Sequence, residues 1–399
     1  MDRVTWTGPR RWWGGPLDVE GLALAAAGEV ARELAELTGR EVAYDSAAVA
    51  GWYGSVSHLR VDGRPIAGFA PLSGFFRAAD GWVRTHANYP HHERALLSAL
   101  GVEDGPSALA AMERIPAREI ERSVFDAGGL AVAVRGAGEL ASARVTGILD
   151  AAPTARFLPH LGAHPLAGLR VLDLTRVIAG PSAARLLAAL GADVLRADPP
   201  HLPELEGQHI ETGFGKRHVV AGPDAIEPLL TGAHVVLVGY RFRGGLAPEA
   251  LRERHPHLAI AALDAWGDAP GWAGRRGFDS VVQAGVGIAR AYGSEDRPGA
   301  LPVQALDMTA GLRMASAVLA LVRRGEAGRA RVSLIDAAAD LMDLEPPADP
   351  VHPVAPRLGE MPSAFGRLVY APPPFSLDGA PLHYPSPPPP VGSGSAAWA

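Results

Sequence analysis

The second half of the chain alternates between strand-like and helix-like spacing of its apolar residues. Residues 169–174 (LRVLDL) are typical of a buried strand. A Gly-Pro turn follows, and residues 182–192 then place apolar side chains at helical spacing. Because residues 193–198 (DVLRAD) predict a second strand, strand, helix and strand fit within about thirty residues, the length of a parallel crossover.

The same alternation repeats further along the chain. Residues 224–233 and 247–256 have helical spacing, whereas residues 234–240 and 258–266 are strand-like apolar runs. The pattern predicts an α/β fold with a Rossmann-like, doubly wound parallel sheet. Such sheets bind ligands where loops leave the carboxyl ends of strands, so we expect a site among residues 175–181, 239–245 and 265–271.

The pattern before residue 161 is different. Residues 19–37 predict a strongly amphipathic helix, residues 74–87 a turn between two strands, and residues 93–101 and 107–115 two short helices. A Gly-x-Gly in residues 127–143 resembles a dinucleotide fingerprint only weakly, because its third glycine and the following acidic residue are missing. These features indicate a second, smaller α/β domain.

The chain is therefore divided into three predicted parts. Residues 1–160 form the small α/β domain and residues 161–345 form the Rossmann-like domain. Residues 346–399 are dense in Pro and are expected to run extended over the surface.

Composition narrows the classes of protein and partner. The 399 residues include 37 Lys and Arg against 43 Asp and Glu, and no basic block overrides this balance, so we expect no nucleic acid partner. The chain has no Cys, which excludes disulfides and thiolate nucleophiles and fits a reducing cytoplasm. We predict a cytoplasmic protein with no membrane partner, since no uninterrupted apolar run reaches the length of a span. The 14 His show no ligand spacing, so no metal is expected.

Seven segments, taken in order, resemble the family III coenzyme A transferases, which include formyl-CoA and carnitine CoA-transferases and the related acyl-CoA racemases. The segments are HPLAGLRVLDLTRVIAGPSAARLLAALGADVLRAD, GFGKRHV, AHVVLVGYR, GFDSVVQAGVGIARAYG, VQALDMTAG and RVSLIDAA, and a seventh, HPHLAIAALDAWG, lies between the third and the fourth. Together they span residues 162–341. The resemblance implies a Rossmann-like domain that binds coenzyme A or acyl-CoA as a substrate.

The order of the remaining segments differs from that of the family. Three segments that look like later parts of the family pattern, FFRAADGWVRTHA, LLSALGV and AGGLAVAVRGAGELAS, here precede residue 161. We infer a circularly permuted or rearranged member. Family members are interlaced homodimers, so the resemblance implies a homodimer, while the rearrangement leaves the interlacing open.

By resemblance, Asp307 is the covalent nucleophile of an acyl-CoA:carboxylate coenzyme A transferase, acting through an aspartyl mixed anhydride and an aspartyl-CoA thioester. The substrates are then an acyl-CoA donor and a carboxylic acid acceptor. Backbone N–H groups of residues 309–311 are expected near the developing oxyanion. The alternative is that Asp307 only caps a helix that begins near Met308.

The phosphates of coenzyme A require cations near strand ends. Arg176, Lys216, Arg217, Tyr240 and Arg241 are the candidate coenzyme A contacts, and of these Arg241 follows a predicted strand at the arginine loop of the family. Each of these cations could equally be a solvated surface charge.

Two positions depart from the family pattern and open alternatives. Ile178 stands where formyl-CoA transferase has a glutamine, and Phe278 stands where the racemases have a histidine. Because phenylalanine cannot move a proton, racemisation is disfavoured, and Asp279 is read as a structural cap or turn residue. A non-catalytic, acyl-CoA-binding relative remains the alternative from a different class.

Overall fold

A seven-stranded sheet forms the centre of the molecule. The computed structural model describes residues 3–157, 164–239, 244–294 and 296–398. The strand order is β11-β10-β9-β12-β13-β14-β8, with the first six strands parallel and β8 antiparallel at one edge. In chain order the parallel strands read 3-2-1-4-5-6, which confirms the Rossmann-like, doubly wound α/β prediction. The strands are β8 (Gly147–Pro153), β9 (Arg170–Leu174), β10 (Asp193–Asp198), β11 (Arg217–Val220), β12 (Val235–Gly239), β13 (Ala259–Asp264) and β14 (Glu326–Ser333).

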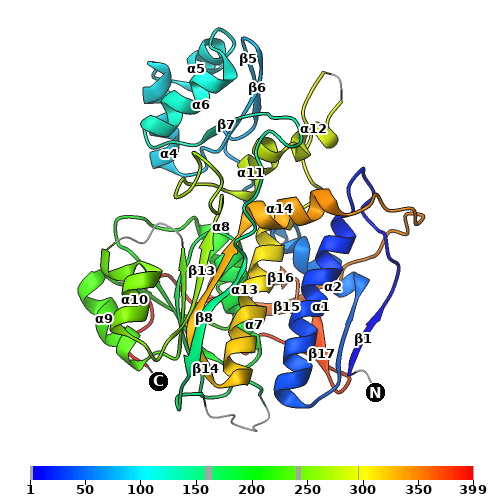
Figure 1. The fold of residues 1–399 in the computed structure, drawn as a ribbon, viewed down its shortest axis with the longest axis vertical. Helices are drawn as coiled ribbons and strands as arrows, with labels where there is room; N and C mark the ends of the chain where they lie inside the picture. The colour runs from blue at the N-terminus through cyan, green and yellow to red at the C-terminus, as the bar shows by residue number, and fades with distance from the viewer. Residues whose placement is uncertain (1–2, 158–163, 240–243, 295, 399) are drawn as a thin grey trace.

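Helices cover both faces of this sheet (Figure 1). On one face, α9 (Pro223–Gly232) and α10 (Pro248–Arg254) pack against one buried apolar cluster. On the other face, α7 (Ala179–Ala189) and α13 (Ala305–Arg324) belong to a larger cluster that also includes α1 (Val19–Thr38). The predicted amphipathic helix at 19–37 is therefore confirmed, but it packs against the Rossmann-like domain.

The small domain is shorter than the predicted residues 1–160. It contains a three-stranded antiparallel sheet with its own buried core, formed between Leu72 and Ala133, and lies above the main sheet in Figure 1. The predicted hairpin near 74–87 is present. Its elements are β5 (Phe75–Ala78), β6 (Gly81–Thr85), β7 (Ala131–Ala133), α4 (Pro90–Leu100), α5 (Gly105–Met112) and α6 (Ala117–Asp126). Helices α11 (Asp279–Val286) and α12 (Ile288–Ala291) lie between it and the main sheet.

The two ends of the chain are joined by two further sheets of short strands. Both sheets pair early strands with late ones, so the segment 346–399 is more than an extended covering. One sheet holds β1 (Val4–Thr7), β2 (Val42–Asp45), β17 (Phe375–Leu377) and β18 (Ala380–Pro381); the other holds β3 (Arg60–Val61), β4 (Arg64–Pro65), β15 (Gly359–Ser363) and β16 (Gly366–Tyr370). The remaining helices of the described residues are α2 (Ser46–Tyr53), α3 (Ser55–His58), α8 (Glu206–Thr212), the 3-10 helix η1 (Gly244–Leu246) and α14 (Leu334–Asp343).

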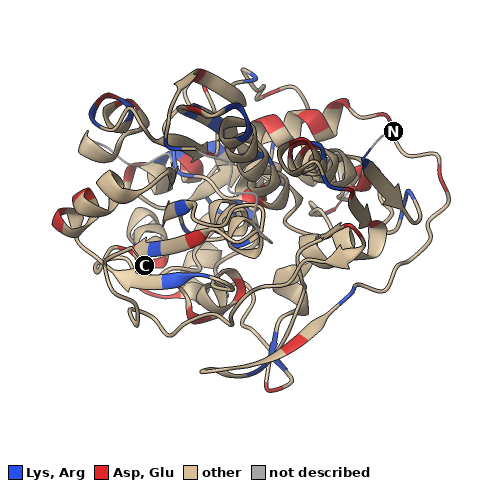
Figure 2. Ribbon diagram, turned by 90° about the horizontal axis from the view of Figure 1, so that it is seen from below, with Lys and Arg blue, Asp and Glu red and all other residues tan. Residues whose placement is uncertain are grey.

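Helix α13 is the most apolar long helix of the described chain. By length and composition alone it could cross a membrane, but 78% of its apolar stretch is buried inside the fold, as in the core helix of a domain. Gly311 lets it approach α7, because a Cβ at that position would lie 2.0 Å from the Ser182 Oγ. Figure 2 shows Lys and Arg interspersed with Asp and Glu over the elements rather than gathered on one side.

Candidate active site

Asp307 lies in the first turn of α13. The helix begins at Ala305 and its N-cap residue is Gln304, so Asp307 is not the helix cap that the alternative reading required. The helix starts at Ala305, three residues earlier than expected, because another side chain satisfies its first free N–H groups.

That side chain belongs to Asp279, at the start of α11. One oxygen of its carboxylate accepts hydrogen bonds from the backbone N–H groups of Leu306 at 2.8 Å and Asp307 at 3.0 Å. The side-chain amide of Gln283 donates to the other oxygen. Asp279 is thus the cap of α13, in agreement with its interpretation as a structural residue.

The two carboxyl groups differ in their surroundings although both are buried. Burial raises the pKa of Asp307 well above its usual range, and the neighbouring Asp279 adds to that effect. Burial also raises the pKa of Asp279, but Gln283 and the two backbone N–H groups oppose the rise. Because donors favour the charged form, Asp279 is the better-stabilised anion of the pair. Asp307 has no side-chain hydrogen bond to any described residue.

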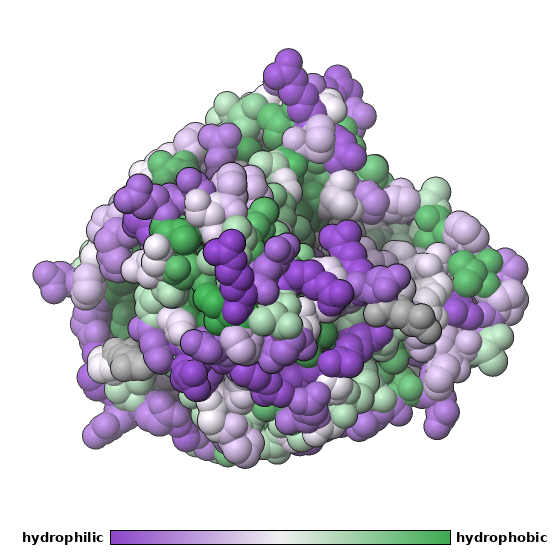
Figure 3. Space-filling model, turned by 90° about the horizontal axis from the view of Figure 1, so that it is seen from above, coloured by the Kyte–Doolittle hydropathy of each residue, from purple (hydrophilic) through white to green (hydrophobic). Residues whose placement is uncertain are grey.

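Asp307 opens into a cleft of about 1240 Å³. The cleft lies between the small domain and the Rossmann-like domain, and both contribute to its walls. Its lining includes His86 and Asn88 from the small domain, Val177 and Ile178 after β9, Gly207 and Ile210 in α8, and Phe278, Ser280 and Gln304 around the carboxylate pair. The loop after β9 is one of the three loops predicted for the site. Seen from the small-domain end, hydrophilic and apolar side chains are mixed over the surface (Figure 3).

The backbone at this loop is strained. Val177 has a φ of 69°, which β-branched residues rarely adopt. Its N–H donates to the Glu204 carboxylate at 3.0 Å, and Glu204 also accepts a hydrogen bond from Tyr89 of the small domain at 2.5 Å. Glu204 therefore holds the loop and ties the two domains together beside the cleft.

The expected oxyanion donors at residues 309–311 are not placed for that role. Since α13 begins at Ala305, their N–H groups lie in the second helical turn, where they point to carbonyls four residues earlier. Thr309 also shares a hydrogen bond of 2.9 Å with Tyr53. Ser280, which we did not single out from the sequence, is a better candidate: it lines the cleft, and its buried hydroxyl has no partner among the described residues.

The candidate coenzyme A contacts differ in their surroundings in the structure. Lys216 is 4% exposed, and its ammonium group donates to Asp173 at 2.8 Å and to the Pro181 carbonyl at 2.9 Å. Burial lowers the pKa of Lys216 to about 8, against the attraction of Asp173. Its charge is thus already matched inside the protein, so it is an internal ion pair rather than an open phosphate contact.

The arginines among these candidates lie nearer the surface. Arg217 pairs with Asp193 at 2.8 Å, and Arg176 donates to the Pro203 carbonyl at 2.9 Å and stacks over Tyr89. Neither lines the cleft that holds Asp307. Tyr240 and Arg241 lie outside the described residues.

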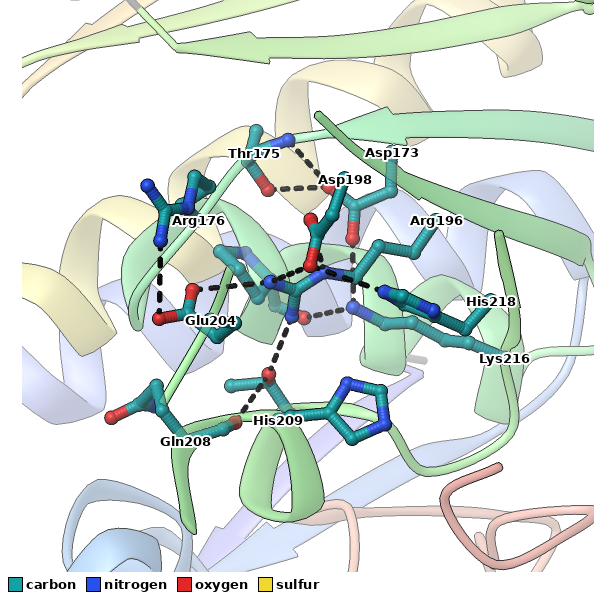
Figure 4. A network of polar contacts seen from close by, with 12 residues as sticks. Asp173, Thr175, Arg176, Arg196, Asp198, Glu204, Gln208, His209, Lys216 and His218 are labelled. Atoms are coloured by element: carbon teal, nitrogen blue, oxygen red, sulfur yellow. Dashed lines mark hydrogen bonds and ion pairs between the residues drawn. The ribbon is translucent and has the colours of Figure 1, made fainter. Parts of the chain in front are cut away.

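A buried network of polar contacts lies next to the cleft (Figure 4). Arg196 is 1% exposed and binds Asp198 at 3.0 Å, Glu204 at 3.1 Å and Thr212 at 3.1 Å. Burial alone would raise the pKa of Asp198, but His218 and Arg196 hold it at about 2. Every charge in the centre of this network has an opposite partner, which is the arrangement of a structural network.

The small domain contributes two buried polar side chains that we did not predict from the sequence. Arg84, on β6, is 7% exposed, and His86, just after β6, is 4% exposed. His86 lines the cleft and stacks on Phe278 with ring centroids 3.9 Å apart. Neither residue lies near Asp307 in the sequence, so no local motif could have linked them to it. No group of three or more potential metal ligands occurs among the described residues.

Comparison with protein families identifies the family of the chain. The model of CoA-transferase family III matches residues 166–209 and 218–377, just over half of the chain. This chain belongs to CoA-transferase family III. The matched ranges include Asp307 and Asp279 but omit residues 210–217, where Lys216 and Arg217 lie.

Individual relatives each match less than half of the chain. A probable fatty acyl-CoA transferase of Mycobacterium tuberculosis is 32% identical over 45% of this chain and 52% of its own length. A succinate–glutarate CoA-transferase of Agrobacterium fabrum is 29% identical over 43% of this chain and 51% of its own. A crystal structure of the mycobacterial protein aligns over 45% of this chain and 56% of its own with a TM-score of 0.40. The chain thus spans about half the length of the curated relatives it matches.

Proposed function

We propose that the protein is an acyl-CoA:carboxylate coenzyme A transferase with Asp307 as its covalent nucleophile. The supporting observation is the contrast within the carboxylate pair: Asp279 caps α13, whereas the Asp307 side chain is unpartnered and opens into the cleft. A structural carboxylate at this depth would be expected to carry hydrogen bonds of its own. Membership of the family supports the same assignment.

The proposed reaction begins when the ionised Asp307 attacks the thioester carbonyl of the donor. The C–S bond breaks, coenzyme A leaves as the thiolate, and an acyl-aspartyl anhydride remains. The thiolate then attacks the aspartyl carbonyl, which releases the first carboxylate and leaves an aspartyl-CoA thioester. The acceptor carboxylate runs the same steps in reverse, so a new acyl-CoA forms and Asp307 is regenerated.

The surroundings of Asp307 suit this role. A carboxylate in an apolar, buried position is a stronger base than one in water, and attack moves its charge onto the thioester oxygen. The Ser280 hydroxyl is the candidate donor to that oxygen, since it lines the same cleft without a partner among the described residues. Phe278 offers no proton-transferring group, so we do not propose racemisation.

The finer assignments belong to the same proposal. We expect an acyl-CoA donor and a carboxylic acid acceptor as substrates, a homodimer as the assembly and the cytoplasm as the location. The homodimer is tested by light scattering of the purified full chain.

The nucleophile is tested by intact mass. The full chain is incubated with a panel of short acyl-CoAs, quenched in acid and weighed, beside Asp307→Asn and Glu206→Gln variants. Glu206 is the matched control because it is an exposed carboxylate on the same cleft. We expect an acyl- or CoA-sized mass gain in the wild type and in Glu206→Gln, and none in Asp307→Asn.

Two results would contradict the proposal. An adduct that persists in Asp307→Asn would place the nucleophile elsewhere. Retention of coenzyme A by a folded wild type that never forms an adduct would instead indicate an acyl-CoA-binding protein.

A further inference from the structure

His86 brings an imidazole from the small domain to the cleft that holds Asp307. It follows β6, is 4% exposed and lines the cleft. The His86 N–H donates to the Leu130 carbonyl at 3.0 Å. The next N–H, that of Ala87, donates to the Ser73 hydroxyl at 2.7 Å. Because these hydrogen bonds fix the backbone, the imidazole has a defined position at the wall of the cleft.

Phe278 sets the orientation of the imidazole. The two rings stack with their centroids 3.9 Å apart and their planes 9° from parallel. Nδ1 of His86 is buried and has no partner among the described residues, so Nε2 is the nitrogen that remains for a molecule in the cleft. Because Nδ1 also lacks an acceptor, the ring hydrogen is better placed on Nε2, where a ligand can accept it. The ring thus presents an N–H donor to the cleft.

The stacked rings lie next to the carboxylate pair. Phe278 lines the cleft and directly precedes Asp279, whose carboxylate accepts a hydrogen bond from the Asp307 N–H at 3.0 Å. Ser280 follows Asp279, lines the same cleft and keeps a hydroxyl without a partner among the described residues. His86 and Ser280 are therefore two unpartnered polar groups that adjoin Phe278, one in space and the other in sequence.

We propose that the Nε2–H of His86 is a second hydrogen-bond donor, beside the Ser280 hydroxyl, to the thioester carbonyl oxygen that Asp307 attacks. The inference rests on the proposed transferase function for the identity of the reaction. When an Asp307 oxygen bonds to the thioester carbon, an electron pair of the C=O bond moves onto the carbonyl oxygen. Both hydrogen bonds strengthen as this charge develops. The pair returns when the C–S bond breaks and coenzyme A leaves as the thiolate, and no proton leaves His86.

Burial makes His86 a hydrogen-bond donor rather than an acid or a base. Its pKa is lowered to about 3 by burial and by the charge of Arg84, so the imidazole is neutral at physiological pH. A neutral imidazole can polarise a carbonyl without the cost of burying a cation. The same low pKa makes the ring a weak base, so His86 does not supply the proton-transferring group that Phe278 lacks.

Two substitutions separate the N–H donor from the ring. His86→Phe keeps an aromatic face against Phe278 but has no N–H group, whereas His86→Gln keeps an N–H donor but has no ring. His91→Phe is the matched control, since His91 lies on α4 of the same domain and does not line the cleft. The Tm of each full-chain variant is measured first, so that a loss of folding is recognised separately from a loss of activity.

The first measurement is the rate at which the full chain gains mass from butyryl-CoA, followed by acid quenching and intact mass. We expect His86→Phe to react about a hundredfold more slowly than the wild type, the effect of losing one oxyanion donor, and His86→Gln to lose about tenfold or less. His91→Phe should react as the wild type does. A fast His86→Phe beside a slow His86→Gln would leave only a packing role for the ring and overturn the proposal, as would equal rates in all variants.

The second measurement needs no turnover. Infrared spectra of carbonyl-labelled butyryl-CoA bound to Asp307→Asn report the polarisation of the thioester, because a hydrogen bond to the oxygen weakens the C=O bond and lowers its stretching frequency. We expect this frequency to rise when His86→Phe is added to Asp307→Asn, and to stay unchanged when His91→Phe is added. An unchanged frequency with His86→Phe would overturn the proposal.

The outcomes keep the two proposals apart. A carbonyl frequency that depends on His86, without any adduct in the wild type, would remove the transferase proposal alone. An adduct that forms equally fast in His86→Phe would remove the donor alone, and failure of butyryl-CoA to bind the wild type would remove both. Exchange of the α-hydrogen of butyryl-CoA for deuterium that requires His86 would make His86 a base and overturn its role as a donor.

Discussion

The buried charged residues of the molecule form two groups, one in which the charges are paired and one in which they are not. Around Arg196, each carboxylate and each cation meets an opposite partner within about the distance of a hydrogen bond. Around Asp307, the carboxylate has no partner, Arg84 has no counter-ion, and Ser280 and His86 each keep a polar atom unsatisfied among the described residues. The two groups lie side by side, on either side of the loop after β9.

This difference separates stability from function. A paired network lowers the penalty of burying its members and can be explained by the folded state alone. An unpaired set costs free energy in the folded state, so its retention is explained by a molecule that binds there. The contrast favours structural roles for Lys216 and Arg196 and supports the proposed chemical role of Asp307.

The largest effect is expected from a variant that breaks the paired network around Arg196. Arg196→Met removes the cation between Asp198 and Glu204, so that Asp198 keeps only His218 at 3.1 Å and Glu204 keeps only Arg176 at 3.6 Å as a cationic neighbour. We expect the free energy of unfolding to fall by about 3–5 kcal/mol, measured by urea denaturation. Arg367→Met, which breaks an exposed pair with Glu360, is the control and should change stability little. If both variants lost the same free energy of unfolding, the buried network would stabilise the fold no more than an exposed ion pair does.

A smaller expected effect concerns the unpaired carboxylate of Asp307, which makes the stability of the protein depend on pH. Because the folded state raises the pKa of Asp307, the folded protein keeps a proton that the unfolded chain releases above about pH 4. The free energy of unfolding of the wild type should therefore fall as the pH rises above about 4 and level off once the pH passes the raised pKa of Asp307. The total loss is about 1.4 kcal/mol for each pKa unit between the unfolded and the folded state.

Asp307→Asn isolates that contribution, because asparagine cannot ionise. The variant should match the wild type near pH 4 and exceed it in stability at neutral pH, as measured by urea titrations across the range. A gap between the two proteins that widens toward low pH would contradict the assignment of the raised pKa to Asp307.

The smallest expected effect concerns the contact between the two groups. Tyr89→Phe removes the hydrogen bond from the small domain to Glu204 but leaves Glu204 bonded to Arg196 and to the Val177 N–H. We expect a loss of about 0.5–1.5 kcal/mol in unfolding free energy. Tyr44→Phe, whose hydroxyl only reaches the Leu24 carbonyl at 3.5 Å, is the control and should lose less. No measurable difference between these variants would indicate that Glu204 does not couple the domains.

Local patterns predicted the main sheet well and the domain boundary poorly. The strands at 169–174, 193–198 and 258–266 were predicted from short, mainly strand-like segments that alternate with helical ones, the pattern of a parallel sheet buried on both faces. The helix at 19–38 was also predicted, but its amphipathic pattern says only that one face is buried and not which partner buries it. For that reason the helix was assigned to the small domain although it packs beside α13.

The sequence likewise predicted some features of the candidate site and missed others. Asp307 was selected from its own segment, because the family motif around it is contiguous. The oxyanion donors at residues 309–311 were misplaced because the start of α13 is decided by Asp279, which lies 28 residues earlier. Burial of Lys216 could not be foreseen, since its partner Asp173 lies 43 residues away on another strand.

The sequence by itself determined the family, the order of the parallel strands and the carboxylate that carries the proposed chemistry, because each depends on contiguous residues. Only the tertiary structure decided which buried charges are paired, since a counter-ion is set by distance in space and not along the chain. His86 illustrates this: more than two hundred residues separate it from Asp307, and domain packing alone brings both to the same cleft.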